Sequence, residues 1–206
     1  MTVTDEARLT SKLLTVNDLE GADFTVVKNA DGTYDPATRT NTCVDDIADI
    51  GFRQDLVPVS TATITFASKT ETGASRLEST LESYQDVDSL SAFVDNFLQL
   101  ARSCTSARGT NDEGVAYDLR VKTEDDPDEP IDGADREVDV EVTGTRTIDD
   151  QVVDIAFSYV VVTVDNDLAR VAAFDEGDAL MAAEAGVTRY GRGIAQEQLR
   201  NLADGN

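Results

Sequence analysis

The chain has 206 residues and is strongly acidic, with 41 Asp and Glu residues against 17 Lys and Arg and a net charge of −24. Nucleic acid is therefore not expected as a partner, because phosphate binding needs clustered basic side chains; adsorption to an anionic bilayer is disfavoured for the same reason. Hydrophobic residues make up 40% and charged residues 28%, which indicates one folded domain over residues 1–206.

The absence of histidine excludes several kinds of chemistry. Ser–His and Cys–His nucleophilic sites need an imidazole base, and two cysteines alone cannot complete a structural zinc site. Neither of the common glycine-rich phosphate-binding motifs occurs, so we expect no cofactor and no metal. A pair of carboxylates is the hydrolytic arrangement that stays open, but it cannot be selected among 41 acids without geometry.

The N-terminal part of the chain alternates short predicted elements with loops. Polar residues 1–7 are expected to fray, and a short helical turn follows them. Turn-forming residues dominate 29–56, which predicts a long loop. Strands are predicted at 23–28 and 58–68. The longest apolar run of the whole chain, 159–164, is far shorter than the ~20 residues that span a bilayer, so no transmembrane segment is expected.

The centre of the chain holds its clearest helical pattern. Apolar residues in 88–103 recur at steps of three and four, which predicts an amphipathic helix that ends just before Cys104. Asp88 is the expected N-cap, and Arg102 suits the negative end of the helix dipole. The preceding segment 75–84 fits both a helix and a strand, so periodicity alone leaves it open.

The second half of the chain has the alternation of β-structure. Apolar residues alternate with charged ones, which predicts an antiparallel sheet with one solvated face. A final amphipathic segment at 187–203 predicts a closing helix, and residues 203–206 are expected to fray. The predicted fold class is α+β: an antiparallel β-sheet with amphipathic helices packed on one face and one disulfide. The expected strands are 115–122, 136–144, 151–164 and 168–174, with an acidic loop at 123–135 and a turn at 165–167.

Cys43 and Cys104 are the only cysteines of the chain. A lone nucleophilic cysteine would lack a base, whereas two free buried cysteines would suit a cytosolic protein. We favour a disulfide between them, which would close a loop of 61 positions (104 − 43) and persist only in an oxidising compartment. Since the chain shows no signal peptide, an export signal would on this hypothesis precede Met1.

Several stretches of the chain share a pattern with a known family. They are the opening LLTVNDLEGADFTVV, the central block from Ile64 to Cys104, the hairpin FSYVVVTVDNDLARVAAF and the final YGRGIAQEQLRNL. Together they resemble the sensor-type domain found in actinobacterial lipoproteins and, outside the membrane, in mycobacterial PknH-type serine/threonine kinases. The resemblance implies that 75–84 is the second strand of a meander. It also implies an extracytoplasmic, cleft-bearing domain that binds something and catalyses nothing.

The chain also departs from this family. The kinase domain carries two cross-links where this chain has cysteines for one, and the tryptophan common ahead of the helix-end cysteine is missing here. Glu20 replaces the proline of the family's opening motif. No kinase or membrane segment accompanies the domain, so a lipid-anchored envelope protein is the closer analogy, with its lipid-bearing cysteine upstream of Met1.

A groove between helix 88–103 and the sheet is the expected ligand site. Tyrosine combines an apolar ring with a polar tip, as ligand pockets often require. The alternative is that the lining side chains simply form the core. The proposed lining residues are Phe97, Tyr117, Phe157 and Tyr159.

The acidic loop 123–135 has a second interpretation as a calcium site. Its carboxylates are suitable oxygen ligands, but the spaced calcium-loop motif is absent and two prolines stiffen the segment. A solvated loop is therefore favoured. The candidate ligands would be Asp125, Asp126, Asp128 and Asp132.

Three classes of function follow from these observations. The favoured one is a non-catalytic, sensor-like domain of the cell envelope, secreted or lipid-anchored, that binds an unidentified ligand or protein partner. The second is a structural or protein-interaction domain without a small-molecule pocket. The third is a carboxylate-dependent hydrolase, which needs two acids facing each other across a cleft.

Overall fold

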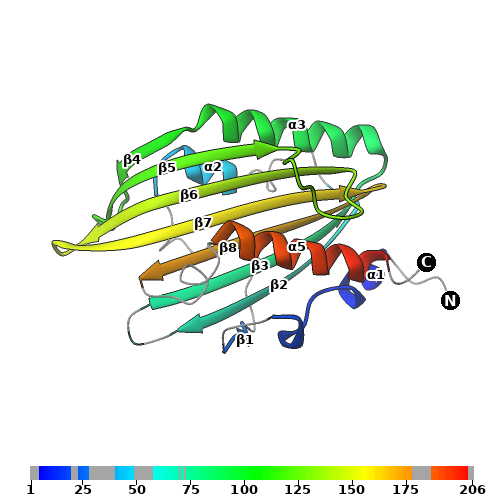
Figure 1. Ribbon diagram of the computed structural model, residues 1–206, viewed down its shortest axis with the longest axis horizontal. Helices are drawn as coiled ribbons and strands as arrows, with labels where there is room; N and C mark the ends of the chain where they lie inside the picture. The colour runs from blue at the N-terminus through cyan, green and yellow to red at the C-terminus, as the bar shows by residue number, and fades with distance from the viewer. Residues whose placement is uncertain are drawn as a thin grey trace.

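The computed structural model of the chain describes residues 5–19, 23–27, 40–48, 58–69, 71, 73–177 and 187–203. Its centre is an eight-stranded antiparallel sheet with helices on both faces (Figure 1). The strand order is β1-β2-β3-β8-β7-β6-β5-β4, so β3 and β8, which are far apart in the sequence, lie side by side. The α+β class and the antiparallel sheet predicted from the sequence are confirmed.

The elements have the following bounds. The strands are β1 (Thr25–Val26), β2 (Ser60–Lys69), β3 (Gly73–Ser83), β4 (Ser106–Thr110), β5 (Ala116–Asp125), β6 (Arg136–Ile148), β7 (Gln151–Val164) and β8 (Asp167–Gly177). The helices are α1 (Asp5–Ser11), α2 (Cys43–Ala48), α3 (Val87–Ser103) and α5 (Val187–Ala203), with a 3-10 turn, η1, at Val16–Asp18.

Most predicted elements are present, with local corrections. The ambiguous segment 75–84 lies almost entirely in β3, as the family resemblance implied. The predicted helix 88–103 is α3, but its N-cap is Asp86, whose side chain accepts the Ser89 N–H at 2.7 Å, rather than Asp88. α1 begins at Asp5, inside the segment expected to fray. α2 interrupts the loop predicted over 29–56, whose stretches 29–39 and 49–56 lie outside the described residues.

The tight hairpin between β6 and β7 fixes the register of the longest strands. Asp149 and Asp150 both have positive φ, 47° and 65°, the conformation of a type I′ turn. This turn has the twist that two antiparallel strands require, and aspartate tolerates the left-handed region better than most residues. The pairing then runs from Ile148 opposite Gln151 to Arg136 opposite Thr163.

Helices cover both faces of the sheet, which corrects the prediction that they pack on one face. Side chains of β7 alternate between two cores: Phe157 and Tyr159 pack with α3 and α2, whereas Val160 and Val162 pack with α5 and α1. The prediction was wrong because it rested on strands such as β5, whose Asp118 is exposed. The unbroken apolar run in β7 is the pattern of a strand buried on both faces.

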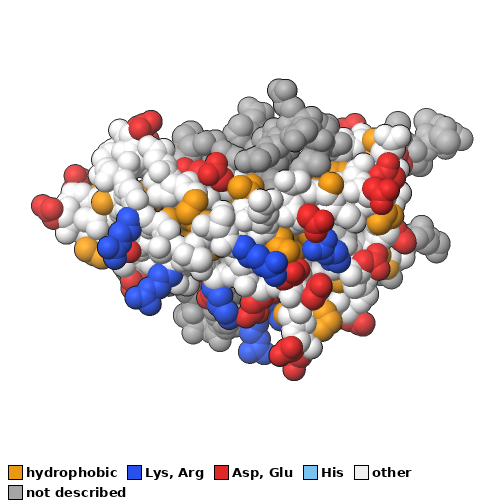
Figure 2. Space-filling view, turned by 90° about the horizontal axis from the view of Figure 1, so that it is seen from above, with side chains coloured by type: hydrophobic (Ala, Val, Ile, Leu, Met, Phe, Trp, Pro, Cys, Tyr) orange, Lys and Arg blue, Asp and Glu red, His pale blue; other side chains and the backbone are white. Residues whose placement is uncertain are grey.

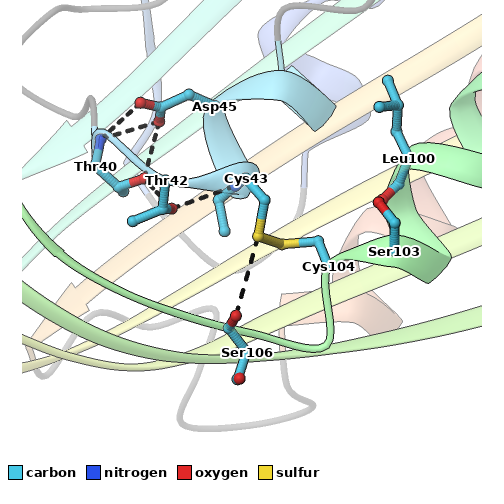
Figure 3. The surroundings of a disulfide bond; sticks show 9 residues. Thr40, Thr42, Cys43, Asp45, Leu100, Ser103, Cys104 and Ser106 are labelled. Atoms are coloured by element: carbon cyan, nitrogen blue, oxygen red, sulfur yellow. Dashed lines mark hydrogen bonds between the residues drawn. A yellow bond between two sulfur atoms is a disulfide. The ribbon is translucent and has the colours of Figure 1, made fainter.

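The predicted disulfide joins Cys43, at the start of α2, to Cys104, at the end of α3, with the two Cα atoms 5.8 Å apart. Figure 3 shows that α2 is held beside the end of α3 by this bond. The Asp45 carboxylate adds hydrogen bonds from the Thr40 and Asn41 N–H groups, at 2.9 and 2.8 Å. The disulfide therefore fixes residues 40–48 to the α3 side of the sheet, and the hydrogen bonds to Asp45 hold the segment in its own shape.

Candidate functional site

The four predicted groove residues all lie between α3 and the sheet, in one cluster. Phe97 projects from α3, and the other three come from β5 and β7. They are closely packed, because their exposed fractions lie between 0% and 6%. The four residues thus belong to the packed core between α3 and the sheet. The members are Phe97, Tyr117, Phe157 and Tyr159.

Tyr117 differs from the other three because its hydroxyl group is buried without a hydrogen-bond partner. Arg146 lies opposite Tyr117 in the β5–β6 register and forms an ion pair with Glu176 of β8. The Nε atom of Arg146 is also buried without an acceptor. Burial raises the pKa of Tyr117, which keeps its hydroxyl protonated, while the charge of Arg146 and a side-chain hydrogen bond from Arg146 act in the opposite direction. The Tyr117 oxygen can accept a hydrogen bond from Arg146, so the Tyr117 O–H is the donor that is left without an acceptor.

A buried donor that lacks an acceptor costs about 1–3 kcal/mol, so this arrangement is unfavourable in the protein alone. An oxygen of a carboxylate or carbonyl group would satisfy the Tyr117 O–H. The aromatic pair Phe157–Phe174, with ring centroids 4.9 Å apart, belongs to the same side of the sheet. The sequence identified Tyr117 and Phe157 by their residue type, but it gave no signal for Arg146, because the partner across a strand depends on register.

A second polar group on the sheet shows the usual, satisfied arrangement. The Tyr84 hydroxyl donates to the carboxylate of Glu82 at 2.8 Å, and Arg170 lies 3.5 Å from the other oxygen of that carboxylate. Burial and the negative charge of Glu82 raise the pKa of Tyr84 well above its ordinary value. Tyr84, Glu82 and Arg170 thus all have polar partners within the protein, and their contacts join β3 to β8.

A surface hollow of about 280 Å³ lies at the other end of α3. Its inner wall is apolar and comes from the first half of α3, whereas its rim is polar and comes from the ends of β6 and β7. Arg136 in the rim is paired with Asp95 at 2.8 Å. The lining residues are Val87, Leu90, Ser91, Val94, Asp135, Arg136, Thr163 and Asp165.

The hollow and the Tyr117 group are separate places. Arg136 and Arg146 stand ten residues apart on β6 (146 − 136), which corresponds to roughly 33 Å along a strand. The α3 side of the sheet thus offers two candidate sites: a buried polar one near the β6–β7 turn and an open, mainly apolar one near the start of α3.

One pair of neighbouring carboxylates, Glu137 and Asp139 on β6, is 1% and 3% exposed. Both lie under α5, where Arg192 contacts them at 2.7 and 3.1 Å. A substrate cannot reach two carboxylates that are covered in this way.

The acidic loop is held by protein contacts. Among the described residues, no three acidic or cysteine side chains are grouped so that they could hold a metal ion. Arg192 donates to the carbonyl oxygen of Glu129, and Gln196 exchanges hydrogen bonds with the backbone of Asp132 at 3.0 and 3.2 Å. The loop 126–135 is therefore docked on α5.

Charged side chains lie intermixed on the described surface seen from above in Figure 2. Exposed arginines pair with acidic neighbours, for example Arg108 with Asp118 at 2.9 Å. Such exposed pairs contribute little to stability, but they neutralise the few basic groups of the chain locally. Among the described helices, none is both long enough and apolar enough to cross a bilayer.

No protein-family model and no curated protein sequence matches the chain. Among solved structures, it is similar to the extracellular domain of PknH from Mycobacterium tuberculosis, with a TM-score of 0.66 and 12% sequence identity. The likeness covers 97% of this chain and 96% of that one. The resemblance found in the sequence is thus confirmed at the level of the fold.

Proposed function

We propose that the chain is a sensor-like domain of the cell envelope, located outside the cytoplasmic membrane, that binds a ligand or a protein partner and catalyses no reaction. The observation that carries this proposal is the fold shared with the extracellular domain of PknH over 97% of the chain. The disulfide supports it, because such bonds persist in oxidising compartments. A lipid anchor or secretion into the envelope is part of the same proposal.

The proposed ligand site is the region of Phe97, Tyr117, Phe157 and Tyr159 under α3. Its support is the buried Tyr117 O–H, which has no acceptor in the protein and lies beside the positive charge of Arg146. A ligand with an aromatic or aliphatic body and a carboxylate or carbonyl oxygen would match this chemistry. Entry of such a ligand requires α3 or α2 to move away from the sheet.

Native mass spectrometry of the protein purified from the envelope of its own host tests this site. We expect a bound molecule of defined mass on the wild-type protein and its loss from Tyr117→Phe, which removes one donor. Ser91→Arg is the matched control, since it fills the distant hollow and leaves the Tyr117 group intact. The small-ligand proposal is wrong if the wild-type protein carries no bound molecule, or if Tyr117→Phe retains it unchanged.

A protein-interaction domain without a small-molecule pocket is the second candidate. The specific observation in its favour is the close packing of the α3–sheet interface, where Phe97 is fully buried. In that case the hollow at the start of α3, with its apolar wall and charged rim, is the natural contact surface. Chemical cross-linking in host cells would then capture a protein partner that Ser91→Arg releases and Tyr117→Phe does not.

A further inference from the structure

Three charged side chains form a closed cluster beneath α5. Arg192 Nε lies 2.7 Å from Glu137 Oε1 and 3.1 Å from Asp139 Oδ2, so one N–H group faces two carboxylates. Glu137 Oε2 accepts the Ile131 N–H at 2.6 Å, and Arg192 Nη2 donates to the carbonyl oxygen of Glu129. The cluster therefore joins three parts of the chain: strand β6, the acidic loop 126–135 and helix α5.

α5 reaches this position because of a glycine beside the arginine. A Cβ atom at Gly191 would lie 3.0 Å from Ser158 Oγ and 3.3 Å from a Val160 methyl group. The helix thus approaches β7 closely at Gly191, and the next residue, Arg192, extends over β6. Arg192 remains 28% exposed, whereas the two carboxylates below it are almost completely buried.

The charges in this cluster do not balance. Glu137 and Asp139 would together carry two negative charges against the single positive charge of Arg192. Both carboxylate oxygens of Asp139 are buried, and apart from the ion contact of Oδ2 with Arg192 at 3.1 Å they receive no well-aligned hydrogen bond. A buried carboxylate in that position is expensive to ionise, whereas the protonated form can donate to Glu137. This arrangement therefore favours a state in which Glu137 and Asp139 together carry one proton.

We infer that Glu137, Asp139 and Arg192 form a proton-dependent latch, which holds the acidic loop and α5 on the sheet while the carboxylate pair carries one proton and loosens both when that proton leaves. Burial, and after it the charge of Glu137, raises the pKa of Asp139 to about 7. The latch accordingly operates in the neutral range. It gives the domain a means of responding to the pH outside the membrane, in addition to the binding proposed above.

The surroundings of Asp139 support this operating range. On β5, Glu124 stands opposite Asp139 in the register, and its negative charge also raises the pKa of Asp139, although Lys122 pairs with it. On β7, the residues opposite Asp139 and Glu137 are the apolar Val160 and Val162. From the loop, Asp126 accepts the Glu137 N–H at 3.3 Å, and α5 contributes Arg192.

NMR on the intact chain tests the latch in two ways. The carboxyl carbon of Asp139 is expected to titrate with a midpoint near pH 7, roughly three units above an ordinary aspartate. Hydrogen exchange at the Ile131 amide, corrected for its intrinsic rate, is expected to lose at least about tenfold protection between about pH 5.5 and about pH 8. Asp139→Asn carries no titratable group and has nearly the same shape, so it should remain protected at both pH values.

Asp118→Asn is the matched control, because Asp118 is an exposed carboxylate on β5 that pairs with Arg108. This variant should keep the wild-type pH response at Ile131. The inference is overturned if Asp139 titrates near pH 4 in the wild-type protein. This measurement needs no variant. The inference is also overturned if wild type and Asp139→Asn show the same change in protection across the pH range.

Discussion

At the residue scale, two of the buried tyrosines on the α3 side, Tyr84 and Tyr117, lead to opposite predictions. Tyr84 donates to the buried Glu82 carboxylate, whereas the Tyr117 hydroxyl has no acceptor. Tyr84→Phe leaves a buried carboxylate oxygen without its donor, so it should lower the free energy of unfolding by about 1–3 kcal/mol. Tyr117→Phe removes an unsatisfied group, so the free energy of unfolding should be unchanged or rise by up to about 1 kcal/mol.

Urea unfolding of both variants beside the wild type measures this difference. The two substitutions delete the same atom from the same kind of residue, so each serves as the control for the other. A loss of stability in Tyr117→Phe equal to that in Tyr84→Phe would show that the Tyr117 hydroxyl has a protein partner. That result would remove the main support for a ligand site at Tyr117.

The raised pKa of Asp139 predicts how the free energy of unfolding changes with pH. Because its pKa is raised to about 7 in the folded protein, the folded state holds a proton that the unfolded state has already lost between about pH 4 and pH 7. The contribution of Asp139 to stability is therefore greatest at low pH and falls as the pH rises through this window. Relative to wild type, Asp139→Asn should become more stable across it, by up to a few kcal/mol.

Unfolding by urea at a series of pH values measures this relative stability. The difference between Asp139→Asn and wild type should grow from about pH 4 to about pH 7 and be constant above. A difference that is independent of pH, or one that shrinks as the pH rises, contradicts the assignment of the proton to this carboxylate pair.

At the scale of single elements, α5 contains two glycines in very different surroundings. A Cβ atom at Gly191 would press on Ser158 and Val160 of β7, whereas a Cβ atom at Gly193 would meet nothing within 4 Å. Alanine inside a helix is favoured over glycine by roughly 0.5–1 kcal/mol. Gly193→Ala should therefore stabilise the protein by about that amount, while Gly191→Ala should lose this gain and destabilise it.

Thermal unfolding of Gly191→Ala and Gly193→Ala gives the comparison, because both variants change helix propensity equally. The melting temperature should rise for Gly193→Ala and fall for Gly191→Ala. Equal increases would mean that α5 does not approach β7 closely at Gly191, and the position of Arg192 over β6 would then need another explanation.

The sequence predicted individual elements well and their mutual arrangement less well. α3 and β7 have long, regular apolar patterns, so their limits were close to those observed. β4 was missed because its sequence, SARGT, contains a glycine and no alternation of apolar residues. α2 was missed because six residues are too few for a helical period.

The sequence predicted a site residue only where the residue type alone was enough to select it. Tyr117 was chosen for its polar tip, but its neighbour Arg146 follows from the register of β5 and β6. Glu137 and Asp139 alternate with valines, and this pattern predicts that the two acids face solvent. They are buried because α5, distant in sequence, docks over that face and supplies Arg192. Contacts of this kind depend on packing that a linear pattern does not contain.

At the scale of the whole molecule, the disulfide closes a loop of 61 residues that includes β2, β3 and α3. In the chain-entropy description, opening a loop of this length lowers the free energy of unfolding by about 4 kcal/mol. Cys43→Ser combined with Cys104→Ser should show a loss of this size in urea unfolding. Reduction of the wild type should give the same loss, and a change of less than about 1 kcal/mol in both would contradict a structural role for the bond.

The most direct test of the central claim concerns where the protein resides and in which redox state. Intact host cells would be treated with a membrane-impermeant amine reagent and a thiol-blocking reagent, and the mass of the recovered protein would be measured without reduction. We predict labelled lysines, such as the exposed Lys122, and a chain that lacks its two thiol hydrogens and takes up no thiol reagent. An unlabelled protein with both cysteines blocked would place it in the reducing cytosol and contradict the proposed envelope function.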